Sequence, residues 1–223
     1  MRMILMTEFA LNTIPFKAVY LHGLVRDAQG RKMSKSLGNN MDPLDVAAKF
    51  GADAARMALV VGNTPGTDMR ISEEKVKGYK HFANKLWNIA RFILDNAQGA
   101  DLSAPLTAAD TDMLAALDVL TKDVTKDIDE FRVYMAAEKM YHYAWHELAD
   151  KILEESKPIL AGSDAAAKAS RQALLLSLLD RTLRLLHPFM PFITEEIWQS
   201  MPAKDAEFLM VARWPSPAEN PRQ

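Results

Sequence analysis

The chain has 223 residues, of which 49% are hydrophobic and 25% charged, and its formal net charge is −2. This composition is ordinary for a folded globular protein, and the length allows one or two domains. Cysteine is absent, which excludes disulfides, thiolate catalysis and cysteine-ligated zinc and is compatible with a reducing cytosol. With so little net charge, nucleic-acid binding would have to come from local basic patches. No apolar run reaches the ~18 residues of a membrane span.

Glycine and proline divide the chain into two regions. Six of the nine glycines lie in the first 70 residues, whereas the remainder consists of long periodic segments with few helix breakers. We therefore expect two domains. Residues 1–70 should form a loop-rich α/β part and residues 71–223 a helical bundle, so the predicted fold class is mainly α.

The first region is predicted to combine short helices, a strand and turns. The strand is expected where Phe, Val and Tyr occur in a short run. Asp42 before Pro43 is a strong helix start, since Asp caps helices and proline favours their first position. The predicted elements are a helix end over residues 2–11, a strand over 16–22, a turn at 27–30, helices over 43–50 and 53–61, and an irregular loop over 63–68.

The second region is predicted to contain five helices. Ser72 and Thr107 are candidate N-caps, and Asp110 gives the second helix a pattern like a capping box. Pro158 should end the third helix, and leucines on nearly all sides of residues 174–186 mark the fourth as the central buried helix. The predicted ranges are 72–96, 107–129, 133–157, 163–187 and 191–200, followed by a strand or an extended tail over 208–214.

The segment RKMSKSLGN, residues 31–39, is the strongest candidate for chemistry. Its two lysines, three positions apart, alternate with small hydroxyl residues, and Gly38 gives backbone freedom. Lysines on a mobile loop suit a polyphosphate, whose negative charge grows in the transition state of nucleotidyl transfer. Hydroxyl and amide groups of the loop add donors. For an arbitrary pair of lysines at this spacing, a solvated basic turn would be the better interpretation.

The string KMSKS, Lys32 to Ser36, resembles the signature of class I aminoacyl-tRNA synthetases. Its flanks resemble the same family, in the same order and over essentially the whole chain. Residues 15–27 and the NTPGTD loop at 63–68 resemble the valyl enzymes. HFANKLWN at 81–88 and LHPFMPFITEEIW at 186–198 resemble the first and last helices of the family's anticodon-binding domain.

This resemblance implies the fold and the activity. Residues 1–70 would be the end of a Rossmann catalytic domain, with the KMSKS loop and stem-contact helices, and residues 71–223 an anticodon-binding helix bundle. The intact protein would attach valine to tRNA(Val), using ATP and Mg²⁺, as a cytoplasmic monomer without membrane contact. Lys35 and Lys32 would be catalytic, and with Ser34 and Ser36 would contact the ATP phosphates.

Other interpretations remain open at this point. Isoleucyl and leucyl enzymes share most of the quoted motifs, and a stand-alone RNA-binding module without catalysis would also keep them. The His-x-Gly-His motif that class I enzymes need is absent from the sequence, as is the editing domain. We therefore expect the chain to be a fragment that does not activate valine alone.

The helix predicted from Ser72 to Asn96 is the best candidate for an RNA surface. Between Asp68 and Arg91 six basic residues stand against three acidic ones, with aromatic residues interleaved. Phosphates are bound by lysine and arginine, and single-stranded bases by stacking and edge hydrogen bonds. Phe82 lies on the apolar stripe and is expected in the core. The side chains off that stripe, which we predict to contact RNA, are Lys85, Asn88 and Arg91.

A metal site is not expected. His142 and His146 have the i, i+4 spacing of zinc ligands, and Glu138 or Asp150 is a conceivable third ligand. Aromatic residues interleave with these histidines, however, and the segment resembles a bundle helix of the family.

Overall fold

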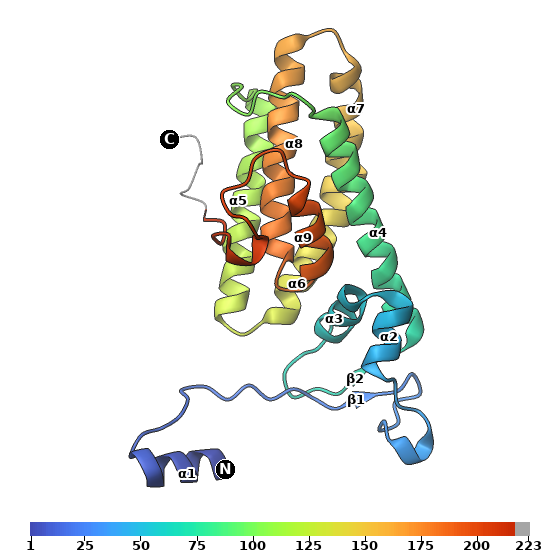
Figure 1. The fold of residues 1–223 in the computed structure, drawn as a ribbon, viewed down its shortest axis with the longest axis vertical. Coiled ribbons are helices and arrows are strands. Elements are labelled where there is room, and N and C mark those ends of the chain that lie inside the picture. The colour runs from blue at the N-terminus through green and yellow to red at the C-terminus, as the bar shows by residue number, and fades with distance from the viewer. Residues whose placement is uncertain (217–223) are drawn as a thin grey trace.

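The computed structural model describes residues 1–216. A tall helical bundle stands on a smaller part that contains two short helices and a two-stranded sheet (Figure 1). The first helix, α1 (Arg2–Leu11), lies apart from both at the end of an extended segment. Among residues 1–216, none of the helices combines the length and the hydropathy that a membrane span requires.

The N-terminal region contains the first departure from the prediction. The helix over residues 2–11 is confirmed, but residues 16–22 form no strand. The sheet instead pairs β1 (Val25–Arg26) with β2 (Met69–Arg70) in parallel. A strand needs a neighbouring edge for its backbone groups, and Val19 and Leu21 remain exposed. High β-propensity alone therefore did not produce a ladder.

Two short helices follow the predicted loop. Helix α2 (Pro43–Phe50) starts as expected, because Asp42 accepts a hydrogen bond of 2.8 Å from the backbone N–H of Leu44. Helix α3 (Ala52–Val60) comes directly after Gly51, whose φ of 92° allows the sharp change of direction. Ala54 and Ala58 of α3 are buried in a small core beneath the bundle.

The bundle contains the long elements that the periodicity predicted. Its centre is the leucine-rich helix near the C-terminus, whose leucines at 174–176, 178 and 179 are buried, so the predicted central helix is confirmed. Its elements are α4 (Glu73–Asn96), α5 (Ala108–Asp129), α6 (Val133–His142), the π-helical η2 (Tyr143–Leu153), α7 (Glu154–Ala161), α8 (Ala165–Leu186), α9 (Pro191–Gln199) and the 3₁₀ turn η3 (Leu209–Val211).

In the bundle one boundary prediction needs correction, and one alternative that the sequence left open is decided. Pro158 does not end the helix predicted over residues 133–157, because helical structure continues through α7 to Ala161. Proline costs a helix one backbone hydrogen bond, and burial of Leu160 in the core helps to offset that loss. Between Phe208 and Trp214 the chain forms the single turn η3 within an extended segment, and no strand.

Candidate functional site

The KMSKS segment forms a short capped turn at the end of a hairpin. An antiparallel bridge joins Lys32 to Arg26 at its base. The turn itself is η1 (Lys35–Leu37), in which Ser34 Oγ accepts a hydrogen bond of 3.3 Å from the N–H of Leu37. Gly38 closes the turn with a φ of 63°, a conformation that glycine adopts without steric cost.

Asp27 and Asn39 tie the two ends of this loop together. Asp27 is 6% exposed and accepts hydrogen bonds from Asn39 Nδ2 at 2.9 Å and from the Arg31 backbone at 2.8 Å. Asn39 Oδ1 accepts in turn from the N–H of Ser34 at 2.9 Å. The bond from Asn39, with further support from Arg31, lowers the pKa of Asp27 to about 2. The loop therefore has a structured stem.

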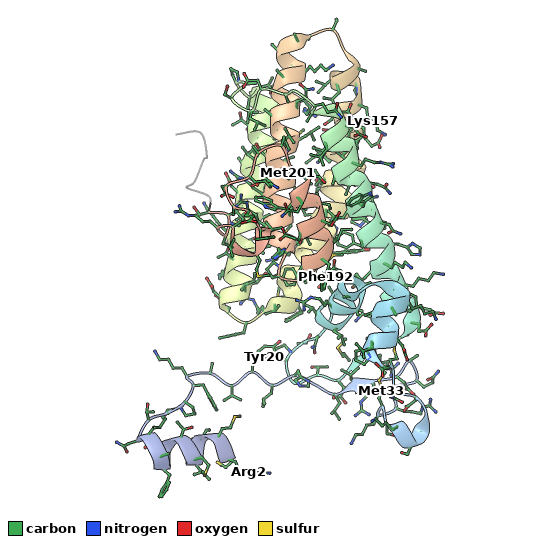
Figure 2. The ribbon with its side chains drawn as sticks, viewed as in Figure 1. Arg2, Tyr20, Met33, Lys157, Phe192 and Met201 are labelled. Atoms are coloured by element: carbon green, nitrogen blue, oxygen red, sulfur yellow. The ribbon has the colours of Figure 1, made fainter. Side chains whose placement is uncertain are left out.

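The predicted ATP-contacting side chains gather on the outer side of this stem. Lys32, Lys35 and Ser36 are exposed, and Ser34 Oγ lies 3.2 Å from Ser36 Oγ. Within residues 1–216, neither lysine ammonium has an ion-pair or hydrogen-bond partner. Two unpaired cations beside two hydroxyl groups suit a polyphosphate, which supplies negative charge and acceptors. Met33, labelled in Figure 2, packs instead toward the small core.

The NTPGTD loop supports the hairpin from behind. Asp68 Oδ1 accepts a hydrogen bond of 2.8 Å from the N–H of Leu24, and its other oxygen pairs with Arg26. These contacts, the backbone bond first, lower the pKa of Asp68. A Cβ atom at Gly23 would lie 1.9 Å from the carbonyl oxygen of Thr67, so only glycine permits this approach of the two segments.

The candidate RNA residues of α4 do not form one free surface. Lys85 Nζ lies 2.6 Å from Asp150 Oδ1 and 4.5 Å from the centre of the Trp145 ring. Asn88 and Arg91 are exposed, and within the described range their side chains have no such partner. Phe82 is fully buried, as expected. The structure therefore brings Asn88 and Arg91 to solvent on adjacent turns and pairs Lys85 with η2.

Sequence reasoning missed an aromatic cluster in which Trp145 lies against Lys85. Tyr141 and Trp145 are half-buried, with ring centres 5.8 Å apart. They contact the Phe82 ring, whose centre lies 4.7 Å from that of Tyr141. These contacts join helices some 60 positions apart, and only the interleaving of aromatic and basic residues in both segments pointed to them.

His142, at the end of α6, and His146, in η2, lie side by side, but in the described part of the chain no third ligand completes a metal site with them. Their ring centres are 4.7 Å apart, but residues 1–216 contain no group of three His, Asp or Glu side chains placed to hold a metal ion. His142 lines a mostly apolar cavity of about 440 Å³ between α5 and η2, together with Met113 and Leu120.

Two protein-family models match the sequence. Residues 1–72 match "tRNA synthetases class I (I, L, M and V)" and residues 110–223 match "Anticodon-binding domain of tRNA ligase". The chain belongs to the class I tRNA synthetases. The resemblance inferred from the KMSKS string and its flanks is thereby confirmed, as is the mainly helical fold with an anticodon-binding domain.

Curated relatives and solved structures agree with this assignment. The chain is 49% identical over 206 residues to the valine--tRNA ligase of Geobacillus kaustophilus and 47% identical over 218 residues to that of Carboxydothermus hydrogenoformans. The alignments cover 90% and 96% of the chain but 23% and 25% of those relatives. The chain thus spans about a quarter of their length.

Among solved structures, the LeuRS–tRNA–LeuAMS ternary complex of Agrobacterium radiobacter K84 matches 99% of the chain and 27% of that protein, with a TM-score of 0.75 and 25% identity. A Mycobacterium tuberculosis methionyl-tRNA synthetase in complex with methionyl-adenylate matches 84% of the chain and 40% of that protein, with a TM-score of 0.66 and 26% identity.

Proposed function

We propose that the protein containing this chain attaches valine to tRNA(Val) at the expense of ATP. The observation that carries this proposal is an exposed KMSKS loop with two unpaired lysines, in a sequence that is 46–49% identical to valine--tRNA ligases over at least 90% of its length. In this proposal the chain supplies the KMSKS loop and the anticodon contact, and alone it does not activate valine.

The loop would act on the triphosphate during valine activation. The valine carboxylate attacks the α-phosphorus of ATP, forming valyl-adenylate and releasing pyrophosphate. Lys35 would neutralise charge that builds on the leaving pyrophosphate, assisted by Lys32, while Ser34 and Ser36 donate hydrogen bonds to phosphate oxygens. Such donors are effective because they are fixed before the charge develops. Mg²⁺ would accompany the ATP.

The bundle would bind the anticodon arm of tRNA(Val). Asn88 and Arg91 are the proposed RNA contacts that solvent already reaches, and Arg91 borders a small cavity of about 160 Å³ beside Trp87. Lys85 belongs to the proposed set on condition that RNA phosphate replaces Asp150 as its partner. We also propose that the protein acts in the cytoplasm, because the absence of cysteine is compatible with a reducing compartment. We propose that it acts as a monomer.

Leucine or isoleucine ligation is the second candidate, because a leucyl complex matches 99% of the chain. A non-catalytic RNA-binding module is the third. A hybrid enzyme, in which this chain replaces the matching quarter of the Geobacillus kaustophilus relative, separates a working synthetase part from a non-catalytic module. The tRNA that the chain itself prefers, tRNA(Val) or the leucine or isoleucine tRNA, separates the first two candidates. Our proposal predicts valine-dependent ATP–pyrophosphate exchange and acylation of tRNA(Val) by the hybrid.

The proposed anticodon contact of the bundle is tested with the 223-residue chain itself. It should bind tRNA(Val) and lose most of its affinity when the anticodon loop is replaced. Binding that ignores the anticodon, together with a hybrid that activates valine but charges no tRNA, would contradict the proposed role of the bundle.

A further inference from the structure

Helix α3 contacts the bundle through two polar side chains on one of its faces. Asp53 and Arg56 are three positions apart and therefore project in similar directions. Both contact residues 188–193, which comprise the α8–α9 turn and the first residues of α9 and lie more than 130 positions away. In Figure 2, Phe192 marks the end of α9 that faces the smaller part of the molecule.

Asp53 caps a helix to which it does not belong. Helix α9 begins with Pro191, which has no N–H, and Met190 before it provides no side-chain cap. Asp53 Oδ1 and Oδ2 accept hydrogen bonds from the N–H groups of Phe192 and Ile193, at 3.2 and 2.7 Å. The otherwise unpaired donors at this helix start are thus satisfied by a carboxylate from α3.

Arg56 holds the other side of the same turn. Its Nη2 donates to the carbonyl oxygen of Pro188 at 2.8 Å, and its Nε to that of Phe189 at 3.2 Å. Asp53 therefore accepts from N–H groups at the start of α9, and Arg56 donates to carbonyl oxygens of the turn just before it. The electrostatics agree, because a carboxylate is favoured at a helix N-terminus.

The Asp53 half of the contact is buried, whereas Arg56 is exposed. Asp53 is 6% exposed, and its burial raises the pKa of the carboxyl group despite the two backbone donors. Met57, on the next turn of α3, is fully buried in the main core of the bundle. The polar contacts therefore add directional bonds to the apolar packing of α3 against α4 and the main core.

The same helix leads to the KMSKS loop. Asn39 ends the loop stem, Asp42 caps α2, and α2 packs directly on α3. A rotation of α3 on the bundle would therefore move the loop relative to any RNA bound to α4.

We propose that Asp53 and Arg56 form a clasp on the α8–α9 turn that fixes the position of the KMSKS loop relative to the anticodon-binding bundle. They are positioning residues and touch no reacting atom. The geometric claim concerns this chain alone, whereas its catalytic consequence rests on the proposed function.

The geometric claim is tested on the 223-residue chain. Because the sequence lacks cysteine, spin labels can be placed at Ala48→Cys on α2 and Ala115→Cys on α5, both exposed. We expect one narrow distance distribution in the parent and a broad or shifted one in Asp53→Ala. Arg56→Lys, which keeps the charge but loses the two-pronged geometry, gives a milder variant should Asp53→Ala fail to fold.

Asp45→Asn, a change to an exposed carboxylate in the first turn of α2, is the matched control and should leave the distribution unchanged. An unaltered distribution in folded Asp53→Ala or Arg56→Lys would overturn the clasp.

The catalytic consequence is measured in the hybrid enzyme. Small misplacements of catalytic groups lower the reaction rate strongly. Asp53→Ala should therefore lower kcat for aminoacylation by about tenfold or more. The KM for tRNA should change by less than about twofold. A variant with unchanged kcat would contradict the positioning role. If the hybrid with Asp53 intact is inactive, the proposed function fails and the label distances alone decide the clasp.

Discussion

The Asp27 carboxylate holds the loop stem together by accepting hydrogen bonds from Asn39 and Arg31. The carboxylate, not the carboxylic acid, accepts from Asn39 and Arg31, which is why its pKa is about 2 against an ordinary 3.8. A lowered pKa means that the contribution to stability is present above pH ~4 and is lost as the pH falls toward ~2.

The carbon-13 NMR titration of the Asp27 carboxyl should therefore have its midpoint near pH 2. Asn39→Ala should raise that midpoint, and Asn40→Ala, a change to the exposed neighbour, should not. A midpoint at 3.8 in the parent chain would show that the stem bonds do not form in solution.

Leu179 tests the assignment of the central helix at the residue scale. Its side chain is fully buried in α8. Leu179→Ala should lower the free energy of unfolding by about 2–5 kcal/mol, since it removes buried methyl groups and leaves a cavity. Urea melts measure this loss, with the exposed Val119→Ala as a control that should cost far less. A loss below about 1 kcal/mol would contradict the position of the core.

At the element scale, α5 and α8 are joined by a buried ion pair that sequence patterning misassigned. Asp110 has the position of a capping-box residue, but its carboxylate accepts from Arg171 Nε at 2.8 Å and also from Ser170. Ser170 Oγ accepts from the Thr107 N–H, at 2.8 Å, in its place. Half of the predicted box is present, because Thr107 Oγ1 accepts from the Asp110 N–H.

Breaking this pair should be costly. Arg171→Leu leaves a buried carboxylate without its cation and should destabilise the chain by about 3–5 kcal/mol. The double variant with Asp110→Leu should lose less than the sum of the two single changes. Lys157→Leu, which breaks an exposed pair with Glu154, should cost under about 1 kcal/mol. Additive losses in a double-mutant cycle would contradict the coupling.

The elements themselves were predictable where a local pattern determines them. Ser72, Thr107 and Asp42 cap their helices as expected, since capping needs only nearby residues. The strand over residues 16–22 and the helix end at Pro158 were wrong because tertiary partners decide both. A strand requires an edge, and a proline is tolerated where packing offsets its missing bond.

At the scale of the whole molecule, the sequence identified the KMSKS loop and the helical bundle but not the connection between them. The loop is contiguous, so its side chains could be named from the string alone. The pairing of Lys85 with Asp150, and the clasp from Asp53 to the α8–α9 turn, join residues far apart in the chain. No periodicity or local motif contains that information. The boundary after residue 70 stays a prediction.

The most direct test of the account is Lys35→Ala in the hybrid enzyme. The ammonium of Lys35 should be most useful when charge builds on pyrophosphate, so its loss should affect the transition state more than ATP binding. Single-turnover formation of valyl-adenylate, measured across ATP concentrations, should slow by a factor of about 10²–10³. Affinity for tRNA should change little, and Lys35→Arg should recover only part of the rate. A variant that weakens ATP binding but keeps the maximal rate would contradict the account.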